Sequence, residues 1–235
     1  MCANFQASRL VRLAEWMEAM GWADPPDDGA YLADIYPGDA APVLAGEPFG
    51  RREPVWRFAD FGMAPDWAKP EIVRHTYNAR SETVAQKPSF RQAWRKRQFG
   101  LVFADAFFEP RYTDQGIERC RIEAADGQPL ALAALWDYAP SRRQHSFTLL
   151  TVNADQHAVM QQFHAPQDEK RMPLLLPQDA WQDWLQASPQ QAQDMLQTAF
   201  DWPVMQVCVQ PRAARRKPAQ ADAAAPDLPQ QASLF

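Results

Sequence analysis

The chain has 235 residues, of which 46% are hydrophobic and 23% are charged, and its formal net charge is −5. This composition is typical of a globular protein, and the length suffices for one large domain or two small ones. The acidic balance excludes binding of nucleic acid through bulk positive charge, so such binding would need a local basic patch. No apolar run approaches the roughly 20 residues that span a bilayer, and no signal peptide is evident. We therefore expect a cytoplasmic protein.

Helices are predicted close to the two ends of the chain. Apolar side chains recur at helical spacing over residues 8–20, where Ser8 is the expected N-cap and Gly21 the expected end. Loops with short extended pieces follow, in a stretch rich in Pro, Asp and Gly. Further helices are expected at 89–97, which is basic, at 177–186 and at 188–200.

Strands dominate the middle of the chain. They are predicted at 54–65, 99–109, 117–125, 130–138, 146–154, 171–176 and 203–211. A turn at Asp126-Gly127 joins two of them. We expect an α+β fold with a curved, barrel-like antiparallel sheet and flanking helices, which forms one domain over residues 2–210. Over 211–235 the composition collapses to mainly Ala, Pro, Gln, Arg and Asp, which predicts a disordered tail.

Cys2 directly follows the initiator methionine, which cells usually remove before a small residue. After removal, Cys2 carries an α-amine and a thiol on adjacent carbons. The amine can condense with an aldehyde to an imine, and the thiol can then close a thiazolidine ring. The amine titrates near ~7.7–8 and the thiol near ~8.5, so both nucleophiles are partly available at neutral pH. Because an N-terminal amine can also act as base for its own side chain, an N-terminal-nucleophile hydrolase is the alternative.

The other cysteines, Cys120 and Cys208, lie far from Cys2 and from each other, and the chain has no CxxC pair. This spacing argues against a disulfide framework and against a cysteine zinc site. Both residues fall in strand-like runs, so we expect them to be buried. The chain also lacks a glycine-rich phosphate loop, an HExxH motif and a GxSxG motif. We therefore expect neither a metal nor a cofactor.

Six short motifs occur together in a specific order. They are MC at the start, GMAPDWAKP at 62–70, YNARSETV at 77–84, FADAFFEP at 103–110, SFTLLTVNA at 146–154 and HAPQDEKRMPLLL at 164–176. With this set the chain resembles the SOS response-associated peptidase (SRAP) family along residues 2–210. The resemblance implies a sensor of abasic sites in single-stranded DNA that shields the lesion during replication or the SOS response, near the nucleoid. It implies that Cys2 forms a thiazolidine crosslink with the opened abasic sugar, and that Cys-dependent autopeptidase and lyase activities accompany it.

The resemblance also implies roles for individual residues in the reaction. Asn78 would hold the amine and the sugar hydroxyl, since an amide both donates and accepts hydrogen bonds. Glu109 follows an apolar run, so partial burial would raise its pKa and let it shuttle a proton. His164 would open the sugar ring or exchange protons with the imine. His157, seven residues earlier, is the alternative histidine.

Contacts with an unpaired DNA strand are implied for four residues, Pro37, Trp67, Arg80 and Arg171. The two arginines would grip phosphates in a fork geometry. Pro37 and Trp67 would line the groove, where a flat ring can stack on an unpaired base. The alternatives are a surface ion pair between Arg80 and Glu82, and buried packing of Pro37 and Trp67.

The chain departs from the family pattern near both groups of residues. Ala3 and Asn4 follow Cys2 where the family start is Met-Cys-Gly-Arg, so an arginine that could contact a phosphate is missing. The histidine of the family stands two residues before the arginine, whereas six residues separate His164 from Arg171. A longer loop must therefore bring His164 back to the site.

Three functions stay open at the level of sequence: an abasic-site crosslinking protein, an N-terminal-nucleophile peptidase and a non-catalytic DNA-binding module. The basic run at 91–97 suits contact with single-stranded DNA. The last residues resemble the peptide by which bacterial proteins dock on the replicative sliding clamp, through Gln231, Ser233, Leu234 and Phe235. A flexible linker would then hold the domain near replicating DNA. We expect a monomer.

Overall fold

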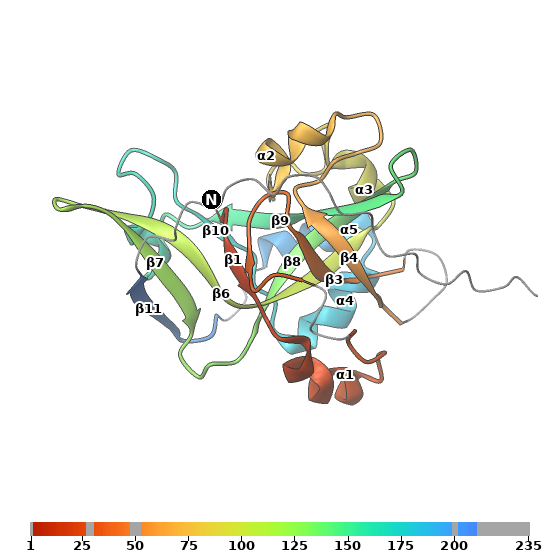
Figure 1. Ribbon diagram of the computed structural model, residues 1–235, viewed down its shortest axis with the longest axis horizontal. Helices are drawn as coiled ribbons and strands as arrows, with labels where there is room; N and C mark the ends of the chain where they lie inside the picture. Colours follow the sequence, from red (N-terminus) through yellow and green to blue (C-terminus); the bar gives the residue numbers. More distant parts are fainter. Residues whose placement is uncertain (1, 27–30, 48–52, 199–201, 211–235) are drawn as a thin grey trace, which may run out of the picture.

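The structure is a computed structural model that describes residues 2–26, 31–47, 53–198 and 202–210 (Figure 1). At its centre five strands form a closed barrel, in which each strand pairs with the next. Around the barrel they are β9 (Gln144–Asn153), β4 (Val55–Phe61), β3 (Ala40–Ala45), β6 (Phe99–Thr113) and β8 (Leu130–Ala139), which pairs with β9 again. The predicted α+β fold with a barrel-like core is confirmed. The pairing of β4 with β9 is parallel, however, so the sheet is not antiparallel throughout.

Within the described residues, six further strands extend the barrel. They are β1 (Phe5–Ala7), β2 (Asp34–Ile35), β5 (Asn78–Arg80), β7 (Gly116–Ala124), β10 (Arg171–Pro173) and β11 (Met205–Gln210). The first half of the 15-residue β6 pairs with β8, and the second half pairs with β7 and leads out of the barrel (Figure 1). The predicted turn at Asp126-Gly127 is present, with Gly127 at a φ of 72°. It joins strands that pair with different halves of β6, so it does not close a hairpin.

Short helices cover the barrel from outside. They are α1 (Ala14–Met20), α2 (Val73–Thr76), α3 (Arg91–Arg95), α4 (Trp181–Gln186) and α5 (Pro189–Gln197), with 3-10 turns at Leu10–Leu13, Pro70–Ile72, Met160–Gln162 and Gln178–Ala180. The four predicted helices are confirmed with shorter bounds. Gly21 ends α1 in the left-handed conformation, as expected. The prediction that Ser8 caps this helix is wrong, because its hydroxyl donates to Asp105 instead (2.6 Å).

Two apolar clusters lie on the two sides of the same strands. On β6, Leu101 and Phe103 pack toward the helices, whereas Val102 and Ala104 belong to the second cluster. This alternation follows from the period of two along a strand. Cys2 is part of the second cluster and is fully buried. The beginning of the described chain is therefore held inside the core.

The two remaining cysteines differ in exposure. Cys120 on β7 is buried as expected, but the expectation for Cys208 is wrong, since it is exposed. The physical reason is that β11 pairs with β7 alone and so forms the edge of the sheet. None of the described helices has the length and the apolar character needed to cross a membrane.

Candidate active site

Cys2 is positioned by the pairing of β1 with β6. The backbone N–H of Phe108 donates to the carbonyl of Asn4 (3.0 Å), and Phe5 stands opposite Phe107. This register places Cys2 beside the segment of β6 that contains Glu109. The thiol of Cys2 lies 3.5 Å from the carbonyl oxygen of Asn4. Burial and the nearby carboxyl of Glu109 raise the pKa of this thiol above its usual range, so it is protonated at neutral pH.

Asn78 holds the backbone of Cys2 from the opposite side. It begins β5, which pairs in parallel with β9, and its Nδ2 donates to the carbonyl oxygen of Cys2 (2.9 Å). Its Oδ1 is buried and has no hydrogen-bond partner among the described residues. A buried amide oxygen without a partner is costly. It is therefore a ready acceptor for an N–H or O–H group at this position.

Glu109 and His164 form a buried pair next to Cys2. The Oε2 atom of Glu109 lies 3.5 Å from Nδ1 of His164. Burial raises the pKa of Glu109 to about 7 and lowers the pKa of His164. The Nε2 atom of His164 faces the carbonyl oxygen of Arg171 at 2.8 Å, so this nitrogen carries the ring hydrogen. Nδ1 of the neutral ring is then an acceptor, and near neutral pH the pair can hold one proton between the two groups.

The long loop before β10 does bring His164 to the site. His164 adopts a φ of 62°, and its backbone N–H donates to the carbonyl of Pro110, the residue after Glu109 (3.0 Å). The alternative, His157, is used differently. Its Nδ1 accepts from the backbone N–H groups of Val159 and Met160, and its ring packs against Trp202. The geometry therefore favours His164 over His157 as the partner of Glu109.

Arg171 is buried, and its two terminal nitrogens bind carboxylates and a backbone carbonyl, whereas its Nε has no hydrogen-bond partner among the described residues. Its guanidinium donates to both oxygens of Glu82 (2.8 and 3.0 Å), to Glu169 (2.7 Å) and to the carbonyl of Thr151 (2.6 Å). Arg80 is more exposed and bonds to the same Glu169 (2.7 Å) rather than to Glu82. The alternative ion pair of Arg80 with Glu82 is thus wrong. Contact of Arg171 with a phosphate stays a prediction, and it would require one of these carboxylates to move.

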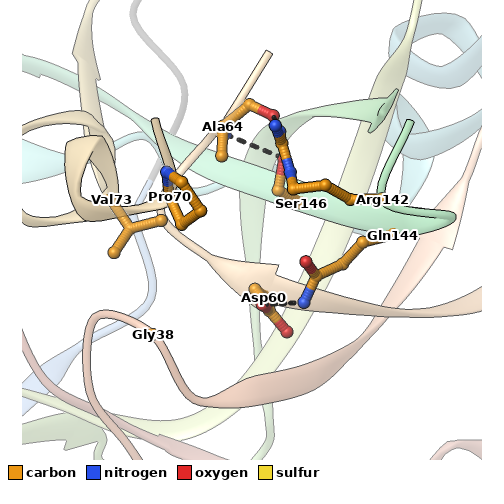
Figure 2. A pocket seen from close by; sticks show the side chains of 8 residues that line it. All are labelled: Gly38, Asp60, Ala64, Pro70, Val73, Arg142, Gln144 and Ser146. Atoms are coloured by element: carbon orange, nitrogen blue, oxygen red, sulfur yellow. Dashed lines mark hydrogen bonds between the residues drawn. The ribbon is translucent and has the colours of Figure 1, made fainter. Parts of the chain in front are cut away.

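Trp67 lies on the loop that follows β4. Its side chain is 62% exposed, which rules out the buried packing role. The guanidinium of Arg142 fixes this loop by donating to the carbonyls of Ala64 (2.6 Å), Pro65 (3.1 Å) and Ala68 (3.1 Å). Figure 2 shows Arg142 reaching toward Ala64, whose backbone N–H donates to Ser146 (2.9 Å). The loop is therefore a rigid platform for Trp67.

The Trp67 platform borders a pocket of about 250 Å³ (Figure 2). Gly38 lies on its other side, and the preceding Pro37 is half-buried. The two residues predicted to line a DNA groove thus come from segments that border one pocket. Inside it, Gln144 donates to Asp60, and burial raises the pKa of Asp60 to about 6.

The basic run at 91–97 divides into two parts. Arg91, Arg95 and Lys96 are exposed at α3, as a nucleic-acid contact would require. Arg97 instead donates to the carbonyls of Ala187 (2.9 Å) and Gln186 (2.5 Å) and so ties α3 to the end of α4. The net basic surface is smaller than the sequence suggests.

Tyr77 is a site residue that the sequence reasoning passed over. Burial raises the pKa of its phenol, and the proximity of Glu109 and Cys2 adds to this effect. Its ring packs edge-on against Phe61 at 5.8 Å. Its position in the motif YNARSETV, directly before Asn78, could have identified it from the sequence. Among the described residues, no three His, Cys, Asp or Glu side chains are grouped so that they could hold a metal ion.

Comparisons with known proteins identify the family of the chain. The family model described as SOS response associated peptidase (SRAP) matches residues 1–211. The chain belongs to this family. It is 30% identical over 194 residues to the abasic site processing protein YedK of Escherichia coli K12, covering 79% of each chain. It is 28% identical over 142 residues to the abasic site processing protein YoaM of Bacillus subtilis 168, covering 58% of this chain and 60% of that one.

Solved structures with a similar fold match as well. A protein from Bordetella bronchiseptica superposes with a TM-score of 0.75 at 30% identity and covers 90% of this chain and 100% of its own. A protein from Bacteroides thetaiotaomicron superposes with a TM-score of 0.68 at 19% identity, covering 88% of this chain and 91% of that one. The second match bears on the fold alone.

The Glu109–His164 pair predicts a specific pattern of kinetic defects. Glu109→Gln should slow the reaction of Cys2 with an aldehyde substrate by about 10²–10⁴-fold, since a positioned acid or base contributes that much. The wild-type rate should fall on the alkaline side as Glu109 loses its proton, and the variant should lack this fall. Single-turnover rates across pH check both points. His164→Ala should also be slow, whereas His157→Ala should react as fast as wild type; the reverse order would contradict the assignment.

The platform predicts that Arg142 acts through Trp67. Arg142→Ala should weaken binding of single-stranded DNA about tenfold, as removal of one base–aromatic stack does. Trp67→Ala should have the same effect, and the double variant should lose no more, because both changes remove one contact. Fluorescence anisotropy measures the affinities. Arg143→Ala removes an equal charge from the neighbouring, exposed residue and is the matched control. Additive losses would show that Arg142 does not act through Trp67.

Proposed function

We propose that this protein senses abasic sites in single-stranded DNA and bonds to them covalently through Cys2. The observation that carries the proposal is the convergence of Cys2, Asn78 and the Glu109–His164 pair at one buried place. The names of the curated relatives, abasic site processing proteins, support the same substrate. The reacting group would be the aldehyde form of the abasic sugar.

The proposed reaction begins with hydrolysis of the peptide bond between Met1 and Cys2, which frees the α-amine. The thiol is held protonated by burial, so the amine is the first nucleophile. The proton held between Glu109 and His164 passes to the ring oxygen of the sugar, the hydroxyl at C1 returns a proton to this pair, and the sugar opens to the aldehyde. The amine then adds to C1, and protonation of the resulting hydroxyl by Glu109 releases water and leaves an imine.

Closure of the ring completes the proposed crosslink. The sulfur of Cys2 adds to the imine carbon, and the thiol proton passes to the nitrogen, which gives a thiazolidine. In the overall reaction, one aldehyde and one aminothiol give one thiazolidine and one water. Asn78 would position the amine, since its Nδ2 already holds the carbonyl of Cys2 and its Oδ1 is available to accept an N–H group.

We further propose that the strand is held by its backbone and by stacking rather than by recognition of base edges. Arg80 is exposed at the rim of the site, and the exposed ring of Trp67 suits stacking on an unpaired base. Pro37 would line the same groove. Arg171 supports the site from beneath. Its backbone carbonyl accepts a hydrogen bond from Nε2 of His164, and its guanidinium binds Glu82 and Glu169. A phosphate that displaced Glu169 would gain contact with both arginines.

The second candidate function is a peptidase that uses Cys2 as an N-terminal nucleophile. The thiol of Cys2 is buried and protonated, whereas the thiolate is the reactive form. Attack of Cys2 on peptide substrates in general is therefore disfavoured. We therefore limit this activity to release of Met1. A lyase activity toward the abasic strand is compatible with the proposed imine, since an imine at C1 acidifies the adjacent carbon. A non-catalytic DNA-binding module would have no use for the buried Glu109–His164 pair.

The proposed sliding-clamp peptide, with Gln231, Leu234 and Phe235, lies outside the described residues, as does the whole predicted tail at 211–235. We retain it as a proposal from sequence. Docking there would raise the local concentration of the domain at replicating DNA. We also retain the proposal that the protein acts as a monomer.

The thiazolidine step is tested by separating the amine from the thiol. Wild-type protein mixed with abasic single-stranded DNA should give a band that survives a denaturing gel without any reductant. Cys2→Ser keeps an N-terminal amine, so it should give a comparable band only when borohydride reduces the imine. Intact mass should show that both active proteins lack Met1. A Cys2→Ser crosslink that is equally stable without borohydride would contradict ring closure by sulfur, and retained Met1 in active protein would contradict the amine chemistry.

A further inference from the structure

A groove of about 590 Å³ runs from the active site across β6, β7 and β11. Ala3, Asn4 and Glu109 line the end next to Cys2, and Ile117, Arg119, Val209 and Gln210 line the part that leads away. Asn4 is two residues from Cys2, so their Cα atoms are at most about 7 Å apart. The groove is therefore continuous with the site at which the DNA strand would be bonded.

Arg119 is the side chain that distinguishes this groove. Its guanidinium carbon lies 3.5 Å from the centre of the Phe108 ring, and its Nη2 donates to Oδ1 of Asn4 (2.5 Å). Among the described residues it forms no ion pair. Its neighbours differ, because Arg111 is paired with Glu118 (2.7 Å) and Arg121 with Glu123 (2.6 Å). A guanidinium has five N–H donors, so stacking and one hydrogen bond fix its orientation while further donors stay available.

Apolar side chains form part of the groove beside Arg119. Ile117 stands two residues before Arg119 on the same face of β7 and is exposed, and Pro110 stands opposite Arg119 on β6. Glu118 also lines the groove, but its charge is compensated by Arg111. A fixed cation beside exposed apolar surface matches a nucleotide, whose phosphate binds the cation and whose base packs on the wall.

We propose that this groove binds the DNA that flanks the abasic sugar, with Arg119 on one of its phosphates. The proposal rests on the proposed function, since the bond to Cys2 is what directs the strand to the groove. Arg119 reaches the side chain of Asn4 from β7 and so places a cation at the end of the groove next to Cys2.

The first test measures binding without covalent chemistry. The probe is a single-stranded oligonucleotide with a tetrahydrofuran in place of the abasic sugar, which cannot form an aldehyde. Arg119→Gln should raise the dissociation constant about tenfold and reduce the slope of log K against log salt by about 0.7, the value for one phosphate contact on a single strand. Arg121→Gln removes an equal charge from a paired arginine and should stay within about twofold of wild type.

The second test locates the contact. Each phosphate near the tetrahydrofuran is replaced in turn by a neutral methylphosphonate. One replacement should weaken wild type about tenfold and leave Arg119→Gln unaffected. Arg119→Lys should keep the salt slope, which a purely structural role would not require. Arg119→Gln could melt at a much lower temperature than wild type. In that case the methylphosphonate scan is made on wild type and Arg119→Lys, and it shows whether one phosphate contacts the cation at position 119.

The proposal is overturned if Arg119→Gln keeps the wild-type salt slope, or if every methylphosphonate affects wild type and variant equally. These outcomes do not depend on the crosslink. Failure of wild type to react with authentic abasic DNA would instead refute the proposed function. Binding of DNA in the groove could then still be measured with the unreactive probe. The two failures are therefore distinguishable.

Discussion

The pairing of β1 with β6 is the constraint on which the rest of the site depends. It inserts the start of the chain into the core, where Cys2 is fully buried, and sets it beside Glu109. Both groups are costly to bury in charged form, so burial keeps the thiol protonated and raises the pKa of the Glu109 carboxyl to about 7. A terminus that lay on the surface would have neither property.

His164 and Asn78 reach the same place from other parts of the barrel, and each arrives through backbone contacts. The parallel pairing of β5 with β9 positions Asn78. Two hydrogen bonds position His164, one from its backbone N–H to the carbonyl of Pro110 and one from its Nε2 to the carbonyl of Arg171. The proposed chemistry is thereby coupled to the fold, whereas Arg80 and Trp67, two of the residues proposed for DNA contact, are exposed. Changes at these exposed residues should alter affinity, and changes at the buried pair should alter the rate.

Much of this arrangement follows from the sequence, because strand and helix periodicity depends on local patterns of burial. Four of the five barrel strands and four helices were predicted in that way. The fifth barrel strand, β3, was not, because it lies in a stretch rich in Pro, Asp and Gly that was expected to form loops. Features that depend on tertiary partners were not. Ser8 has the chemistry of an N-cap but finds Asp105, and Cys208 has a strand environment but lies on an edge strand. Arg171 is a phosphate ligand by residue type, but its burial and its contacts with Glu82 and Glu169 depend on tertiary partners and could not be predicted.

The proposed reaction requires one proton held between Glu109 and a neutral His164 beside the amine of Cys2. Nuclear magnetic resonance of the protein that begins at Cys2, with labelled carboxyl carbons and imidazole nitrogens, tests it most directly. The Glu109 carboxyl should titrate with a pKa of about 7, and His164 should stay neutral at that pH with its hydrogen on Nε2. Titration of Glu109 in the ordinary range near ~4.3, or a doubly protonated His164 at neutral pH, would contradict it.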